Sequence, residues 1–383
     1  MKKNVIAILT VTALLLCSCY QGAPPRTNSE GEEKQFTAQK DSTQGQGLQV
    51  TPPKGLEGTL VRTTPVKDQG TSDLCWIYAM LATIESEHLM MGDSVNLSPV
   101  YLGRYHLMQQ AQRRHLLRVQ SPASLSTSNL PDINTRGMAS RAITLLQRHG
   151  VTHWDAYHPD INMKVLARKV EKTVDSNRNS SHIKLFKNMK DMMDETMRPL
   201  PQYVFMLGAE YTPQEFARSV CRPDEYVALT SFSHHPFGEK FALELPDNCD
   251  QDQFLNLHPD TLMSKIDQAL FSGHPVCWEG DISEPGFNWP RGIAHLDRKI
   301  DRESLSGDPL TTARQLAFEN GETTDDHCME LIGIARTPRG RKFYVAKNSW
   351  GTGNAYKGLM YLSENYLRLK TIAVWMTQEA FEN

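Results

Sequence analysis

Cysteine is scarce in this chain, since seven of its 383 residues are cysteines and two of those stand within the first 19 positions. So few cysteines exclude a small, disulfide-dense scaffold. An excess of charge of one sign is also lacking, because the formal net charge is −3, and nothing in it indicates a nucleic-acid partner. With 39% hydrophobic and 22% charged residues, the composition is that of a globular protein long enough for one large domain or two packed lobes.

Long hydrophobic runs are missing too, apart from one short run near the start, MKKNVIAILTVTALLLCSC. Two lysines followed by an apolar core too short to span a bilayer predict a secretory signal over residues 1–19. Its end resembles a bacterial lipoprotein box, in which a small residue precedes the lipidated cysteine. Ser18 precedes Cys19 and Leu16 precedes Cys17, so Cys19 is the predicted lipidation site. The alternative is an ordinary cleaved signal with two incidental cysteines.

These features predict an exported bacterial lipoprotein, periplasmic or on the cell surface, held to the membrane by acyl chains rather than by a spanning helix. Residues 20–55 are rich in Gln, Gly, Pro, Ser and Thr and almost lack aliphatic residues. Such a segment buries too little surface to offset its chain entropy, which predicts a disordered tether. The folded domain is expected over 56–383.

Within this domain the pattern changes from helical to strand-like at about residue 225. Helical periodicity and capping signals predict helices at 76–90, 98–118, 138–147 and 260–271, and a helical insertion over 163–197 with a break near 176–181. Apolar runs between turn residues predict strands in YVALTSF, FALEL, PVCW, ELIGIA, KFYVAK, GLMYL and IAVWM. The expected fold class is therefore α+β with a helical N-terminal lobe, an antiparallel β C-terminal lobe and helical insertions.

One cysteine stands where a catalytic thiol would. In KDQGTSDLCWIYAMLATIES, residues 67–86, Cys75 opens an apolar helical run. A helix N-terminus or a neighbouring imidazolium stabilises a thiolate, although a lone cysteine before an apolar helix is more often core packing. Gln69 precedes it by six residues, across a turn that carries Gly70.

Gln69-Gly70 followed by Cys75-Trp76 resembles the nucleophile loop of papain-like cysteine peptidases. Two further signatures of that family follow in the expected order, His327 at the start of an apolar strand and Asn348 in Asn-Ser-Trp-Gly. The resemblance implies a two-lobed papain-like fold and a peptidase acting on peptides or proteins without a cofactor. It makes Cys75 the nucleophile, His327 the proton carrier, Asn348 the group that orients His327, and Gln69 an oxyanion donor.

Within this superfamily the chain is most similar to aminopeptidase C and bleomycin hydrolase. The segments 226–248, 272–283 and 364–367 carry this likeness, together with the long interval between Cys75 and His327. Enzymes of that branch continue past the last strand as an arm whose terminal carboxylate meets the substrate's amino group. This chain ends soon after that strand, so the resemblance is not expected to carry over exopeptidase specificity or the hexameric assembly.

Two local departures from the family pattern concern charge near the site. Asp73-Leu74 occupies a turn in which small papain-like enzymes carry small residues. Asp325 and Asp326 precede His327 and are interpreted either as groups that raise its pKa or as solvated loop acids. Two other functions remain open: a Cys-His-Asn acyltransferase with an amine as acceptor, and a papain-fold binding protein that has lost activity.

The remaining cysteines lack the spacing of a metal site such as Cys-x-x-Cys. The sequence therefore predicts no metal centre, and it fixes no disulfide pairing among Cys221, Cys249, Cys277 and Cys328. Cys328, next to His327, is interpreted as a packed thiol rather than a second nucleophile.

Overall fold

The computed structural model describes residues 57–120 and 130–383, apart from 178, 207, 298 and 303. The predicted signal over 1–19, the lipidation site Cys19 and the tether over 20–55 lie outside these residues. Across the described ranges, no helix combines the length and the apolar character that crossing a membrane requires.

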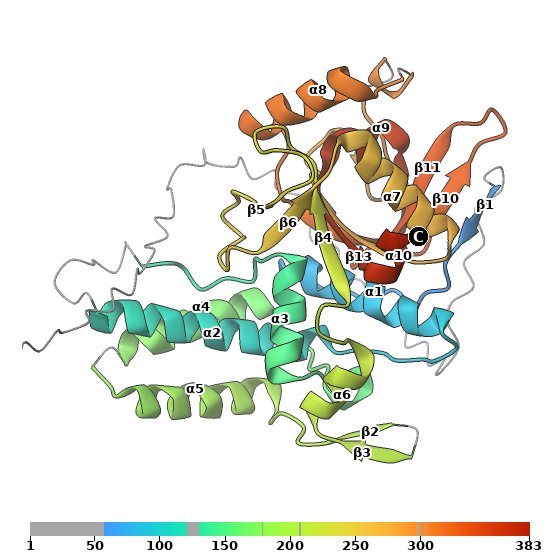
Figure 1. The fold of residues 1–383 in the computed structure, drawn as a ribbon. Helices are drawn as coiled ribbons and strands as arrows, with labels where there is room; N and C mark the ends of the chain where they lie inside the picture. The colour runs from blue at the N-terminus through green and yellow to red at the C-terminus, as the bar shows by residue number, and fades with distance from the viewer. Residues whose placement is uncertain (1–56, 121–129, 178, 207, 298, 303) are drawn as a thin grey trace, which may run out of the picture. The chain divides into compact units, whose positions relative to one another are not determined.

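Helices dominate the first half of the described chain and strands the second, so the α+β prediction is confirmed (Figure 1). The α-helices are α1 (Cys75–Met90), α2 (Pro99–Gln120), α3 (Ala139–His149), α4 (Met163–Ser176), α5 (His182–Met197), α6 (Pro213–Val220), α7 (Pro259–Phe271), α8 (Gly307–Glu319), α9 (Glu364–Lys370) and α10 (Gln378–Glu382).

An 11-stranded mixed sheet forms the β lobe. Its strands are β1 (Glu57–Leu60), β4 (Tyr226–Thr230), β5 (Lys240–Ala242), β6 (Gln253–Asn256), β7 (Val276–Gly280), β8 (Phe287–Asn288), β9 (Ile293–Ala294), β10 (His327–Arg336), β11 (Lys342–Lys347), β12 (Leu359–Ser363) and β13 (Thr371–Thr377). Their order is β5-β6-β4-β13-β7-β10-β11-β12-β9-β8, with β1 beside β10. The pairings are antiparallel except β4 with β6 and β12 with β9. β2 (Val204–Met206) and β3 (Ala209–Tyr211) form a separate hairpin.

Local signals placed several helix ends correctly. Thr212 and Glu215 make both hydrogen bonds of a capping box at the start of α6. The predicted break in the 163–197 segment separates α4 from α5, and the Ser181 side chain caps α5. Gly150 ends α3 with φ 82°, a conformation that side chains with a Cβ rarely adopt.

Gly150 also lies against the start of α6, which makes it a sharp test of this packing. A Cβ at position 150 would stand 2.4 Å from the carbonyl carbon of Pro213. Gly238 has φ 91° and open space around its Cβ position, so it is a matched control. Both alanine variants carry a backbone cost for a positive φ, and at Gly150 the pair φ 82°, ψ −174° is a region that is essentially confined to glycine. Gly150→Ala alone should lower the free energy of unfolding by about 1–3 kcal/mol more, because its added methyl group overpacks the contact with α6.

Urea unfolding of Gly150→Ala and Gly238→Ala measures this difference. We expect Gly150→Ala to be clearly the less stable of the two. Equal losses in the two variants would contradict the close contact between α3 and α6.

The helix that carries the candidate nucleophile is buried on every side. The sequence predicted an apolar stripe at positions 77, 80, 81, 84 and 89, but the structure buries every residue from Cys75 to Leu89. The expectation of a single stripe was therefore wrong. The reason is that α1 contacts α2 and α3 on one side and β7 and β10 on the other, so it has no solvent face (Figure 1). Its polar side chains are paired, as in the ion pair between Lys67 and the fully buried Glu85.

Candidate active site

Cys75 is the first residue of α1, and its thiol is directed toward the start of β10. Leu74 occupies the N-cap position without a side-chain cap, so the first N–H groups of α1 keep their partial positive charge beside the sulfur. α1 packs directly on β10, whose first two residues are His327 and Cys328. This packing brings together side chains that are 252 positions apart in the sequence, from 75 to 327.

His327 is held by the segment that follows β11. Its Nε2 lies 2.7 Å from Oδ1 of Asn348, which leaves Nδ1 as the ring nitrogen available to a thiol. The Trp350 ring covers the histidine with a centroid separation of 4.7 Å, and Trp289 packs edge-on against Trp350 at 5.3 Å. His327 and Asn348 are both buried, at 3% and 2% exposure. A buried imidazole with one nitrogen fixed in this way is oriented for proton transfer at the other.

The pKa of the Cys75 thiol lies well below its ordinary value. A hydrogen bond from the Cys328 thiol contributes most, and the hydrogen bond and positive charge of His327 add to it, against the opposing effect of burial. Burial raises the pKa of Cys328, so Cys328 remains a protonated donor. The structure thus gives Cys328 a contact with the candidate nucleophile that the sequence did not indicate.

Gln69 is held between the loop that precedes α1 and the loop that follows β11. Its Oε1 accepts a hydrogen bond of 2.5 Å from the Ser349 hydroxyl, and its Nε2 donates one of 2.5 Å to the Ser72 carbonyl. The backbone pairing of Asp68 with Trp350 fixes the same two loops. One of the two amide hydrogens of Gln69 is therefore engaged, and the other remains for an oxyanion.

The unusual turn before the nucleophile is accommodated by the helical lobe. Leu74 is fully buried and packs against Gly103 of α2, where an added Cβ would stand 2.9 Å from Leu74 Cδ1. The Asp73 carboxylate pairs with Lys164 at 3.0 Å and accepts a hydrogen bond of 3.3 Å from the Thr135 hydroxyl. The charge of Asp73 is thus compensated by neighbours in the helical lobe.

Three carboxyl groups, those of Asp247, Asp325 and Glu279, interact electrostatically with one another or with the thiol. Arg136 pairs with Asp247 at 2.9 Å and with Asp325 at 3.8 Å. Glu279 lies beside Cys328 in the register of β7 and β10 and is 2% exposed. One oxygen of Asp325 and one of Glu279 are buried without a hydrogen-bond partner. Asp247 and Asp325 thus share the Arg136 guanidinium.

Burial raises the pKa of each of these three carboxyls, and nearby negative charges add to the shift. The pKa of Asp325 rises to about 7 because it is buried and faces Asp247, although Arg136 opposes the shift. Burial raises the pKa of Asp247, and the charge of Cys75 adds to it. Burial raises the pKa of Glu279 well above its ordinary value, and the charges of Asp325 and Cys75 add to this shift. Asp247 and Glu279 escaped the sequence analysis because no motif marks them.

The lowered pKa of Cys75 gives a testable pH dependence. A thiol with an ordinary pKa loses about tenfold in alkylation rate for each pH unit below that pKa, because only the thiolate reacts. Because its pKa is lowered, Cys75 should remain a thiolate at pH values below the ordinary pKa of a cysteine thiol. Its iodoacetamide rate is therefore expected to change only a few-fold between pH 8 and pH 6. Peptide mapping by mass spectrometry measures this rate, with the exposed Cys249 as the reference in the same sample. A tenfold fall per pH unit at Cys75 would contradict the thiolate assignment.

No disulfide joins the cysteines that the structure describes. Of the clusters of His, Cys, Asp and Glu found in the described ranges, the one suited to a metal ion is His234, His235 and Glu244. The sequence analysis did not single out these residues, although the adjacent histidines are a visible signal. His234 and His235 lie between β4 and β5, and Glu244 follows β5.

A helical lobe and a β lobe that meet at a cysteine, a histidine and an asparagine define a papain-like fold, as predicted. The structure is similar to the crystal structure of PepW from Lactobacillus rhamnosis HN001 (DR20), with a TM-score of 0.67 and 16% sequence identity. That match covers 84% of this chain and 81% of PepW.

Residues 204–380 match the Peptidase C1-like family. The chain is 25% identical over 149 residues to aminopeptidase G of Lactobacillus delbrueckii subsp. lactis, covering 38% of this chain and 33% of the relative. It is 23% identical over 175 residues to aminopeptidase C of Lactobacillus helveticus, covering 42% and 37%. The chain thus spans about a third of the length of the curated relatives it matches. The predicted resemblance to papain-like cysteine peptidases of the aminopeptidase C type is confirmed.

Proposed function

We propose that this chain is a papain-like cysteine peptidase that hydrolyses peptide bonds through an acyl-enzyme. The observation that supports this most is the placement of Cys75 at the start of α1, beside a His327 whose Nε2 is bound to Asn348 at 2.7 Å. A thiolate poised against an imidazolium is the arrangement that nucleophilic acyl transfer requires. The Peptidase C1-like match over residues 204–380 supports the same conclusion.

In this mechanism the Cys75 thiolate attacks the carbonyl carbon, and Gln69 and the Cys75 backbone N–H stabilise the oxyanion. The His327 imidazolium gives its proton to the leaving amine nitrogen as the C–N bond breaks, which leaves a thioester. Water then attacks the thioester while His327 takes its proton, and the acid product leaves as the thiolate re-forms. Asn348 keeps the ring in the required orientation.

The substrate side of the proposal is that a free amino terminus is preferred. The charge of Cys75 acts on Asp247, and Asp247 and Asp325 together have one guanidinium, that of Arg136, to offset them. The α-amino nitrogen of an N-terminal residue is two bonds from the carbonyl carbon that would react. The charge of Cys75 acts on the Asp247 carboxyl, so an ammonium group two bonds from the reacting carbonyl carbon is expected to be stabilised by the Asp247 charge. The names of the two relatives, aminopeptidases G and C, agree with this preference.

Export and lipidation at Cys19 complete the proposal and depend on residues 1–19 of the sequence. The test of the peptidase itself is hydrolysis of short peptides by the wild-type chain and by Cys75→Ala. Loss of hydrolysis in the variant is expected, and unchanged hydrolysis would overturn the proposal.

A further inference from the structure

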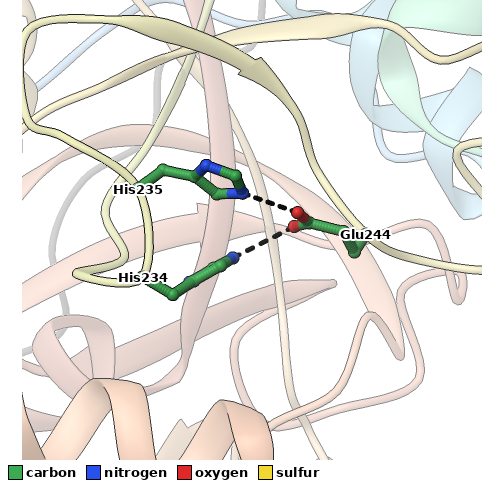
Figure 2. Close-up of side chains that lie close together, drawn as sticks. All are labelled: His234, His235 and Glu244. Carbon is green, nitrogen blue, oxygen red and sulfur yellow. Dashed lines mark hydrogen bonds and ion pairs between the residues drawn. The ribbon is translucent and has the colours of Figure 1, made fainter.

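Two histidines and a glutamate converge in the β lobe, on residues that the peptidase mechanism does not use. His234 and His235 lie between β4 and β5, and Glu244 follows β5. His235 Nε2 is 2.6 Å from Glu244 Oε1, and His234 Nε2 is 3.0 Å from Glu244 Oε2. Figure 2 shows both rings directing Nε2 toward the same carboxylate. One ligand atom from each of the three residues lies within 4.8 Å of the others.

The rings are held in place by contacts outside the cluster. The His235 ring stacks on Phe241 with centroids 4.1 Å apart, and the His234 ring lies parallel to Phe318 at 5.8 Å. Gln315 of α8 faces the other nitrogen of His234: its Oε1 lies 3.3 Å and its Nε2 3.0 Å from Nδ1. In the tautomer that carries the proton on Nδ1 and donates it to Gln315 Oε1, Nε2 presents a lone pair that can bind an ion in place of its contact with Glu244.

An oriented second nitrogen is the usual environment of a metal-binding histidine. Gln315 is itself fixed, since it is 8% exposed and donates a hydrogen bond of 2.8 Å to Glu319. Glu244 supplies the carboxylate ligand, with one oxygen facing each imidazole ring.

The donor set selects the type of ion. Two imidazole nitrogens and one carboxylate oxygen suit zinc and its first-row neighbours, whereas calcium and magnesium prefer oxygen ligands. Tetrahedral zinc with bonds of about 2.0–2.1 Å separates its ligands by roughly 3.3 Å, so small side-chain shifts would admit the ion. The side chains of His234, His235 and Glu244 are 26%, 35% and 54% exposed, which leaves the fourth position to water.

We propose that His234, His235 and Glu244 bind one divalent transition-metal ion of the zinc class. The ion ties the segment between β4 and β5 to the chain that follows β5. This site is separate from the catalytic residues and does not depend on the proposed peptidase activity.

The experiment is titration of the full chain with ZnCl₂, followed by calorimetry. Cys75→Ala serves as the background, because a catalytic thiolate beside His327 would bind zinc by itself. One zinc ion per chain is expected. Glu244→Gln and His234→Ala in that background should each remove the binding, and Gln315→Leu should weaken it roughly 10–100-fold. The control His182→Ala, an exposed histidine of α5, should bind zinc as the background does.

Two further measurements make the assignment specific. Co²⁺ in place of zinc should give visible d–d bands without a thiolate charge-transfer band, which excludes Cys249 as the ligand. Bound zinc should also raise the melting temperature of the background by mass action, and it should not raise that of Glu244→Gln. Absence of zinc binding at micromolar concentrations, or binding that survives Glu244→Gln and His234→Ala, would overturn the proposal and leave a hydrogen-bonded His-Glu cluster.

Discussion

Cys75→Ala is expected to abolish peptide hydrolysis, with a fall in kcat/KM of roughly 10⁴-fold or more. Removing the nucleophile of a triad leaves only the binding and oxyanion contributions, because the remaining groups act through it. The measurement is cleavage of a fluorogenic peptide panel over long incubations. Cys75 is 8% exposed and alanine is smaller, so the variant should fold. Near-ultraviolet circular dichroism checks this.

The matched control is Cys249→Ala, which removes an exposed cysteine outside the catalytic group and should retain full activity. A peptidyl epoxide should label the wild type at Cys75 and leave Cys75→Ala unlabelled. A wild-type chain that neither cleaves peptides nor reacts with the epoxide would point to a papain-fold binding protein instead. New amide bonds to an added amine, in place of new termini, would point to an acyltransferase.

The second large effect concerns the substrate's amino group. A peptide with a free amino terminus is expected to be cleaved roughly 10–100-fold more efficiently than its acetylated counterpart. An ammonium group that meets a buried, underpaired carboxylate gains a charge-assisted hydrogen bond, and a close charge pair of this kind contributes on the order of 2–3 kcal/mol. Acetylation removes the charge and adds bulk. The measurement is kcat/KM for the two peptides at pH 8, where Asp325, with a pKa of about 7, is ionised.

Variants of the two aspartates separate the effect of the carboxylate charge on the rate ratio from the effect of the added bulk of the acetyl group. Asp325→Asn and Asp247→Asn should reduce the ratio of the two rates by lowering only the rate for the free peptide. Asp250→Asn, which removes an exposed partner of Arg141, should leave the ratio unchanged. The ratio should also fall as the pH drops through 7, because protonation of Asp325 removes its charge.

A third peptide is acetylated and carries arginine before the residue that is cleaved. It tests whether a basic side chain can take the place of the amino-terminal ammonium group. Equal rates on the free and acetylated peptides, together with hydrolysis lost in Cys75→Ala, would reject the amino-terminal preference while leaving the peptidase proposal intact.

Much of the fold was readable in the sequence, because local signals fix local structure. The capping box at Thr212, the glycine at position 150 and the alternation of apolar runs with turns after residue 225 placed elements that the structure contains. The full burial of α1 was not predictable in this way. Apolar periodicity reports one face of a helix, and only the packing of two lobes determines whether the other face meets solvent.

Some of the residues around the candidate thiol were predictable from the sequence, and others were not. The order of Gln69, Cys75, His327 and Asn348 along the chain was sufficient to nominate them, because each sits in a short motif with its own chemistry. Glu279 and Cys328 meet through the register of β7 with β10, and Asp247 reaches the site through its pairing with Arg136. Such contacts depend on which strands and loops are neighbours, and no local pattern encodes that.

The sequence by itself determined the candidate chemistry, since a cysteine at a helix start and a histidine and an asparagine at strand boundaries are recognisable from their neighbours. Only the tertiary structure decided the electrostatic surroundings of that chemistry. The pKa of Cys75 and of the three nearby carboxyls follows from burial and from charges contributed by distant segments, and both depend on distances that exist only once the chain has folded.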